Sequence, residues 1–254
     1  MLGESKIIKM ILNMLGNEIR TEINDYVNDV YSRDFVVMKS SDDIDNLFKD
    51  ANDSFLSCLS QEELIDLRSY TGYNFRNINA ILRENWTYDV NGKLSQSKID
   101  EYKNLSNNIS DILSMFNMPS FDFITFRGTT IKSFNSYGIN TIDDLKSLKG
   151  KFLYEQGFIS TSLLEDSCYF NKNLETLENY NIKIKYLIPR ESTEGALINA
   201  YETSYSTNQN EFLLDKGSLS KVIDVVINGN SAILTVVLVP KKIYDKDKYK
   251  NKSK

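Results

Sequence analysis

Residues 123–128, Phe123-Ile124-Thr125-Phe126-Arg127-Gly128, mark the point where this 254-residue chain changes from a helical to an extended pattern. Before them, up to about residue 118, apolar residues recur at helical spacings of three and four, as in Ile7, Ile8, Ile11, Met14, Leu15 and Ile19. After them, short β-branched and aromatic runs occupy 158–162, 182–188, 196–200, 221–227 and 232–239. Helices first and strands afterwards predict an α+β fold with antiparallel sheets.

Local signals predict where several helices begin. The Ser60-Gln-Glu-Glu stretch has capping-box spacing, and Ser97 begins a weaker acidic variant of it. Thr141 predicts the N-cap of a helix over 142–148, which Gly150 would end.

The halves are joined without a Pro/Ser/Gly-rich linker, so we expect a single domain over 1–254. It would consist of a mainly helical part (1–118), a β-rich core (119–240) and a Lys-rich tail (241–254). The tail is interpreted as a frayed end, the usual fate of such a charge run.

Composition excludes several classes of function. The chain is 41% hydrophobic and 26% charged with three prolines, which is typical of a soluble globular protein. It contains no His, and this excludes Ser-His and Cys-His catalytic pairs and removes the commonest zinc ligand, so no metal is expected. Cys58 and Cys168 lack redox or metal spacing and are both interpreted as buried thiols.

Net charge is −5, and the segment from Met1 to Pro240 sums to −10, which argues against binding a nucleic-acid polymer. No apolar run reaches the length of a membrane span. The first thirty residues mix Glu, Asn, Asp and Lys, so the leader of a secreted protein would be absent from this chain.

Arg127 follows a strand predicted to be buried, where an unpaired guanidinium would be costly. It therefore needs an anion, which could be a ligand or a structural salt-bridge partner.

Two polar motifs follow in the β-rich half. In Gly157-Phe-Ile-Ser-Thr-Ser-Leu163, strand alternation sends Ser160 and Ser162 to one face and Thr161 to the other. These hydroxyls could hold a carboxylate, or could simply be solvated on an edge strand. In Gln209-Asn-Glu211, the carboxylate could stabilise a developing cation while the carboxamide holds a second substrate.

The ordered combination of Arg, then Ser-Thr-Ser, then Gln-x-Glu resembles the mono-ADP-ribosyltransferase toxins of the Arg-Ser-Glu class. Within that class the chain is most similar to the Rho-modifying clostridial exoenzymes, and next to the catalytic components of binary actin toxins. The resemblance covers roughly residues 60–240.

A helical stretch extends the resemblance. Tyr70-Thr71, Ile78-Asn79 and Leu82-Arg83 are similar to the family's dinucleotide-flanking helix, where a Tyr and an Asn nine residues later contact NAD. The resemblance thus implies NAD contacts for Tyr70 and Asn79. Without it, Tyr70 would be a core or surface aromatic and Asn79 a solvated helix residue.

The resemblance implies two antiparallel sheets packed as a sandwich around an NAD cleft, with the helical part closing one side. NAD would be a co-substrate, with its pyrophosphate held by Arg127 beside Gly128. Ser160 would orient Glu211, and Glu211 would bond the nicotinamide ribose and stabilise the oxocarbenium ion. Thr161 and Ser162 would complete the cofactor-binding motif.

The acceptor is implied by position 209. Family members with Glu there mostly modify Arg, whereas Gln accompanies amide acceptors such as the Rho Asn. Spacing aligns Tyr169 and Lys172 with the aromatic and Arg of the family's phosphate loop, so Lys172 replaces a guanidinium. Tyr205 is nearest to the target-recognition aromatic, in a loop one residue longer than usual.

The favoured hypothesis is a monomeric enzyme, secreted and acting in host cytoplasm, that modifies a Rho-type GTPase and also cleaves NAD with water. Actin or a guanine base is the alternative acceptor. A non-catalytic binding module on the same fold is the hypothesis from a different class.

Overall fold

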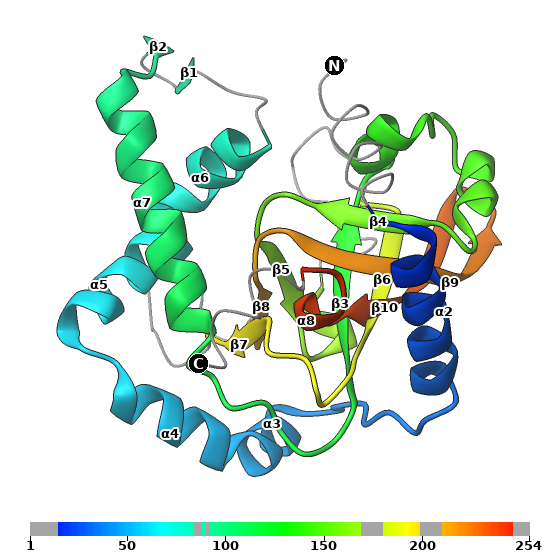
Figure 1. Ribbon diagram of the computed structural model, residues 1–254, viewed down its shortest axis with the longest axis horizontal. Helices are drawn as coiled ribbons and strands as arrows, with labels where there is room; N and C mark the ends of the chain where they lie inside the picture. The colour runs from blue at the N-terminus through cyan, green and yellow to red at the C-terminus, as the bar shows by residue number, and fades with distance from the viewer. Residues whose placement is uncertain (1–14, 84–87, 90–91, 169–179, 199–209, 246–254) are drawn as a thin grey trace.

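Helices fill the first half of the chain and strands the second, so the α+β prediction is confirmed (Figure 1). The computed structural model describes residues 15–83, 88–89, 92–168, 180–198 and 210–245. The helices are α2 (Asn17–Tyr31), α3 (Ser41–Leu47), α4 (Lys49–Cys58), α5 (Gln61–Ser69), α6 (Phe75–Leu82), α7 (Gln96–Leu113) and α8 (Lys241–Tyr244). A π-helical turn, Tyr70–Asn74, joins α5 to α6.

The strands form an eight-stranded sheet in the order β4-β9-β10-β6-β3-β5-β8-β7, and β1 (Tyr88–Asp89) pairs with β2 (Gly92–Lys93) apart from it. The eight are β3 (Phe123–Thr129), β4 (Phe152–Glu155), β5 (Ile159–Ser162), β6 (Ile182–Ile188), β7 (Gly195–Leu197), β8 (Glu211–Leu214), β9 (Ser218–Asn228) and β10 (Ser231–Val239). Short 3₁₀ turns lie at Ile131–Tyr137, Asp143–Leu148 and Glu165–Ser167.

The sheet differs from the expected pair of separate antiparallel sheets. Hydrogen bonds connect all eight strands, and β6 and β10 run parallel. The β9–β10 hairpin uses one edge of β10, so its other edge is completed by a strand distant in sequence. The two halves of the sheet meet at a single residue pair between β3 and β5, Phe126 with Ser162. Across this junction Phe212 of β8 packs edge-to-face on Phe123 of β3, with ring centroids 5.2 Å apart.

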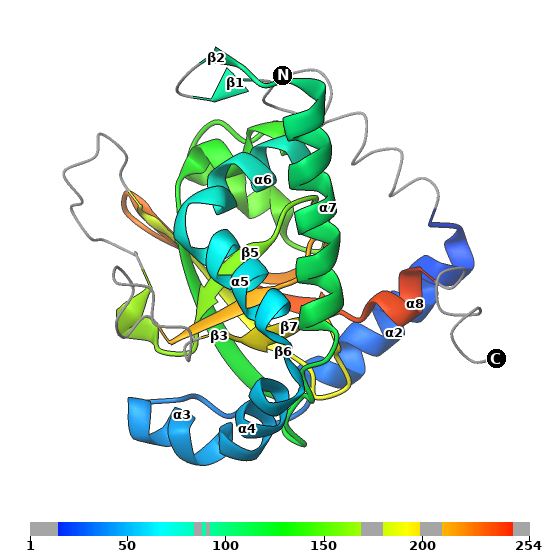
Figure 2. The same cartoon turned by 90° about the vertical axis from the view of Figure 1, so that its left-hand side faces the viewer.

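The main core lies between the helical half and one face of the sheet. Along β6, Ile182, Ile184 and Tyr186 are buried while Lys183 and Lys185 are half-buried, the alternation expected of a strand with one core-facing side. Figure 2 looks onto α5, α6 and α7, which lie over β5 and β7. Burial of this shared face holds the helices against the strands that carry the predicted site.

A second apolar cluster covers the opposite face of β3. Ile23, Val27 and Val30 lie on one side of α2 at spacings of four and three and pack in a cluster with Ile124 and Phe126. The predicted helical pattern before Leu15 lies outside the described residues. α2 begins at Asn17.

The helix-start predictions had mixed outcomes. The Ser60 capping box is confirmed, because the Ser60 hydroxyl accepts from the Glu63 amide at 3.2 Å while the Ser60 amide donates to the Glu63 carboxylate at 2.7 Å. The predicted start at Ser97 is wrong, since α7 begins after Ser95, whose hydroxyl accepts from the Lys98 amide. Thr141 does accept from the Asp144 amide, but the turn that follows is 3₁₀.

The prediction of two buried thiols is half wrong. Cys168 is buried, whereas Cys58 is exposed. Cys58 is the last residue of α4, and the chain then becomes extended so that Leu59 turns into the core in its place.

The start of the Lys-rich tail is ordered. Lys241–Tyr244 form α8, and Lys241 is only 7% exposed. Its ammonium group pairs with the Asp215 carboxylate and donates to the Lys216 carbonyl at 2.7 Å. Because this ammonium has two acceptors, its burial is tolerated, and the interpretation of 241–254 as a frayed end is wrong at residues 241–244.

Candidate functional site

The Ser-Thr-Ser strand and the Gln-x-Glu strand lie side by side. β5 and β8 pair antiparallel with Ser162 opposite Glu211 and Ser160 opposite Leu213. Glu211 is the half-buried first residue of β8, and its carboxylate accepts a hydrogen bond from the Ser160 hydroxyl. Two of the predicted residues, 51 positions apart in the chain, are thus in contact.

The backbone immediately before Glu211 is fixed by a left-handed residue. Asn210 has φ +46°, a conformation that Asn tolerates better than most residues. Its carbonyl accepts from the Leu163 amide at 2.9 Å, and its side-chain amide donates to the Ser41 hydroxyl at 3.3 Å. These contacts of Asn210 fix the direction in which β8 starts, and with it the orientation of the Glu211 side chain.

Arg127 completes the cluster from β3. Its Nη1 atom donates to the Ser160 carbonyl oxygen at 2.8 Å, which satisfies part of the guanidinium; Arg127 lies within β3, two residues before its end, and does not follow the strand. Arg127 also lines a cavity described below. The expected anion is therefore not a protein carboxylate in a salt bridge among the described residues, and the charge is available to a ligand.

Burial and charge set the acidity of Glu211. Desolvation raises the pKa of its carboxyl above the ordinary value, while the hydrogen bond from Ser160 and the positive charge of Arg127 oppose that rise. Ser160 and Arg127 thus stabilise the carboxylate form in a site that otherwise disfavours it.

The hydroxyl groups of Thr161 and Ser162 form hydrogen bonds with backbone groups around the site. The Thr161 hydroxyl is buried and donates to the Phe212 carbonyl at 2.6 Å, across to β8. The Ser162 hydroxyl accepts from the Leu164 amide at 3.1 Å. Gly128 is half-buried and pairs with Lys183 of β6, beside Arg127.

Tyr70 and Asn79 contact each other next to Phe158, the residue just before β5. Asn79 is 9% exposed, so the expectation of a solvated helix residue is wrong. Its side-chain oxygen accepts from the Phe158 amide at 2.8 Å, and its NH₂ group donates to the Tyr70 hydroxyl at 3.3 Å. The Tyr70 ring packs against Phe158 with centroids 5.0 Å apart. Burial and, after it, the charge of Glu211 raise the pKa of Tyr70, which therefore stays protonated close to the carboxylate.

Gly157 has no Cβ atom, and this leaves room for the Asn79 side chain beside the Phe158 amide. Replacing Gly157 therefore tests the contact between Asn79 and the start of β5. A Cβ atom at residue 157 would meet the Asn79 side-chain oxygen at 2.6 Å. We expect Gly157→Ala to displace Asn79 and β5, lowering Tm by several degrees and NAD turnover about tenfold, because overpacking typically costs about 1–3 kcal/mol. Gly72→Ala, where no atom lies within 4 Å, is the matched control for thermal unfolding and turnover. Wild-type values for Gly157→Ala would show that the Asn79 contact does not hold β5.

A cavity of about 360 Å³ opens beside Arg127. Its walls include a second guanidinium, Arg83, together with Glu155 and Tyr186. Arg83 Nε donates to the Glu155 carboxylate at 2.8 Å, and the same oxygen accepts from the Gly157 amide. Two guanidinium groups on one cavity fit a diphosphate.

Arg83 belongs to the Leu82-Arg83 pair of the predicted helical motif but is not among the predicted NAD contacts. The available signal was its spacing, four residues after Asn79, which places both on one side of α6 and its C-terminal end. Tyr169, Lys172, Tyr205 and Gln209 lie outside the described residues. Within the described ranges no group of His, Cys, Asp and Glu could hold a metal ion, and no helix is long and apolar enough to cross a membrane.

Comparison with known proteins identifies the family. Residues 44–243 match the family described as ADP-ribosyltransferase exoenzyme. The NAD(+)–arginine ADP-ribosyltransferase EFV of Enterococcus faecalis is 26% identical over 180 residues, which are 71% of this chain. The chain spans about a third of that relative's length, 32%.

Two solved structures share the fold. The C3 exoenzyme of Clostridium limosum superposes with a TM-score of 0.65 at 23% identity, covering 82% of this chain and 99% of that one. C3stau2 of S. aureus, solved with NAD, gives 0.63 at 19% identity, covering 82% and 100%. The chain therefore belongs to the ADP-ribosyltransferase exoenzyme family, a class of toxins that use NAD as co-substrate.

Proposed function

We propose that this chain transfers ADP-ribose from NAD to an asparagine side chain of a Rho-type small GTPase, as a secreted toxin acting in the host cytoplasm. The observation that carries the chemistry is one cluster, in which Ser160 hydrogen-bonds Glu211 and Arg127 donates to the Ser160 carbonyl.

Each residue of this cluster has a part in the proposed reaction. Arg127 and Arg83 would bind the pyrophosphate of NAD at the cavity that they line. Glu211, oriented by Ser160, would stabilise positive charge at the ribose carbon while the glycosidic bond breaks and nicotinamide leaves with the bonding electrons. The acceptor amide nitrogen then bonds that carbon and loses a proton. Water in place of the acceptor would give free ADP-ribose, the proposed side activity.

The acceptor assignment rests on Gln209. A carboxamide can both donate to and accept from another carboxamide, whereas an arginine acceptor is better matched by a carboxylate. The Enterococcus faecalis relative is named for arginine, so transfer to arginine is the competing outcome.

Labelled NAD with a host-cell lysate tests the proposal. Label on a protein the size of a small GTPase, stable to reagents that cleave arginine linkages, is expected, and Glu211→Gln is the control that should give no label. Label on actin, on arginine or on nucleic acid would overturn the acceptor assignment but keep the transferase. Absence of label and of NAD cleavage would favour a non-catalytic binding module.

Gln209→Glu tests the role of the carboxamide. We expect transfer to the protein acceptor to fall about tenfold or more while NAD cleavage by water stays within about twofold, because only the acceptor contact loses a donor. Both rates are measured on the same preparation. Equal losses in the two would remove Gln209 from acceptor recognition.

A further inference from the structure

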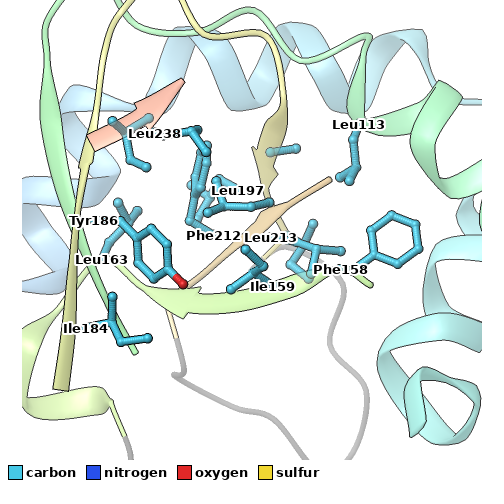
Figure 3. Close-up of a cluster of buried hydrophobic side chains, with 14 of the residues drawn as sticks. Leu113, Phe158, Ile159, Leu163, Ile184, Tyr186, Leu197, Phe212, Leu213 and Leu238 are labelled. Atoms are coloured by element: carbon cyan, nitrogen blue, oxygen red, sulfur yellow. The ribbon is translucent and has the colours of Figure 1, made fainter. Parts of the chain in front are cut away.

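Tyr186 interrupts an otherwise aliphatic and lysine-containing strand at the wall of the cavity. It lies on β6 directly opposite Thr125 of β3, and two residues along β3 from Thr125 is Arg127. Period-two alternation places Tyr186 and Arg127 on the same face of the sheet. Both line the cavity. Figure 3 shows the Tyr186 ring directed from β6 toward Ile159 of β5, another residue of the cavity wall.

The Tyr186 hydroxyl has no hydrogen-bond partner in the described part of the chain, although the residue is only 6% exposed. Tyr137, another tyrosine of the cavity wall, differs in this respect, because its hydroxyl donates to the Tyr154 carbonyl and accepts from the Tyr154 amide. The Tyr186 oxygen is not among the fully buried side-chain atoms that lack a partner, so it is accessible from the cavity that Tyr186 lines, where a ligand oxygen can accept from it.

The charged groups near Tyr186 indicate which kind of ligand atom its hydroxyl could bind. Burial raises the pKa of Tyr186 to about 12, with Arg127 and Arg83 opposing and Glu155 adding to the rise. The phenol is therefore a neutral donor at physiological pH. The two guanidinium groups are donors only, and the Glu155 oxygen Oε1 already accepts from Arg83 and Gly157. A hydroxyl donor beside two cations matches an anionic oxygen.

We propose that Tyr186 is a substrate-binding residue that donates its hydroxyl proton to a phosphate oxygen of a diphosphate held between Arg127 and Arg83. In the proposed function this diphosphate is the pyrophosphate of NAD, so the assignment rests on that function. The two arginines attract the diphosphate by charge, and a hydrogen bond from Tyr186 would in addition fix the orientation of one phosphate oxygen.

Tyr186→Phe removes only the hydroxyl and retains the buried ring. We expect Kd for NAD and for ADP-ribose, measured by calorimetry, to rise about ten- to a hundredfold, the usual effect of losing a hydrogen bond to a charged group. KM should rise with Kd, while kcat stays within about twofold. Nicotinamide riboside, which has no phosphate, should bind both forms equally.

Tyr102→Phe is the matched control. Tyr102 is also buried, but its hydroxyl accepts from Asn77 and it does not line the cavity. Its replacement should leave the affinity for NAD unchanged. Thermal unfolding of both variants separates a binding defect from a folding defect.

The outcomes separate this inference from the proposed function. Wild-type affinity of Tyr186→Phe for NAD and ADP-ribose, or equal weakening of nicotinamide riboside, overturns the role of Tyr186 and leaves the transferase intact. If the wild type does not bind NAD, the proposed function fails, and inorganic pyrophosphate becomes the probe. Weaker pyrophosphate binding by Tyr186→Phe would then still support the diphosphate site, and unchanged binding would overturn it.

Discussion

Glu211→Gln is expected to lower kcat for ADP-ribose transfer by about two to three orders of magnitude while Kd for NAD changes less than about threefold. An amide has nearly the shape of the carboxylate and can still accept from the Ser160 hydroxyl, so the ground state is preserved. It lacks the negative charge that would stabilise the cation formed as nicotinamide leaves, and losing one such group typically costs about 10²–10³ in rate. Single-turnover nicotinamide release and NAD calorimetry measure the two quantities.

The same substitution has a pH signature. The pKa of Glu211 lies above its ordinary value of 4.5, so the folded protein binds this proton more tightly than the unfolded chain does. The ionised carboxylate therefore destabilises the fold at neutral pH, and this cost disappears as pH falls below the unfolded pKa. We expect Glu211→Gln to raise Tm at pH 7 but not near pH 4. Wild-type activity should decline on acidification at a pH above 4.5.

Glu165→Gln is the matched control for these measurements. Glu165 is an exposed carboxylate paired with Lys183, and it does not line the cavity. Its replacement should alter neither kcat nor the decline of activity on acidification. Near-wild-type transfer by Glu211→Gln would exclude Glu211 as the cation-stabilising group.

Arg127→Lys is expected to weaken NAD binding about a hundredfold with a smaller effect on kcat. A guanidinium can donate to the Ser160 carbonyl and at the same time present a fork of N–H groups to a diphosphate. An ammonium group keeps the charge but cannot reproduce both interactions, and each hydrogen bond to a charged group contributes about 1.5–3 kcal/mol. Calorimetry with NAD and ADP-ribose measures the loss.

Arg76→Lys provides the comparison, because Arg76 is exposed on α6 and does not line the cavity. It should bind NAD as the wild type does. Unchanged affinity in Arg127→Lys would mean that the phosphates lie elsewhere. A large fall in Tm would instead indicate that Arg127 acts through its bond to Ser160.

Local patterns determined a large part of this protein. The switch of period at residues 123–128 predicted the α+β class, and strand alternation predicted that Thr161 faces away from Ser160 and Ser162, although not which of the three hydroxyls is buried. The order of Arg, Ser-Thr-Ser and Gln-x-Glu predicted the family. Such features are readable because they depend on side-chain periodicity and residue chemistry within a few positions.

Only the tertiary structure decided how those segments meet. The parallel pairing of β6 with β10, the inward turn of Asn79 onto the Phe158 amide and the burial of Lys241 each depend on a partner more than twenty residues away. Arg83 and Tyr186 acquire their roles only because α6 and β6 border the same cavity. Sequence periodicity shows which face of an element is apolar, but the free energy that selects its partner comes from packing between distant elements, and this explains why the pairing was not predictable.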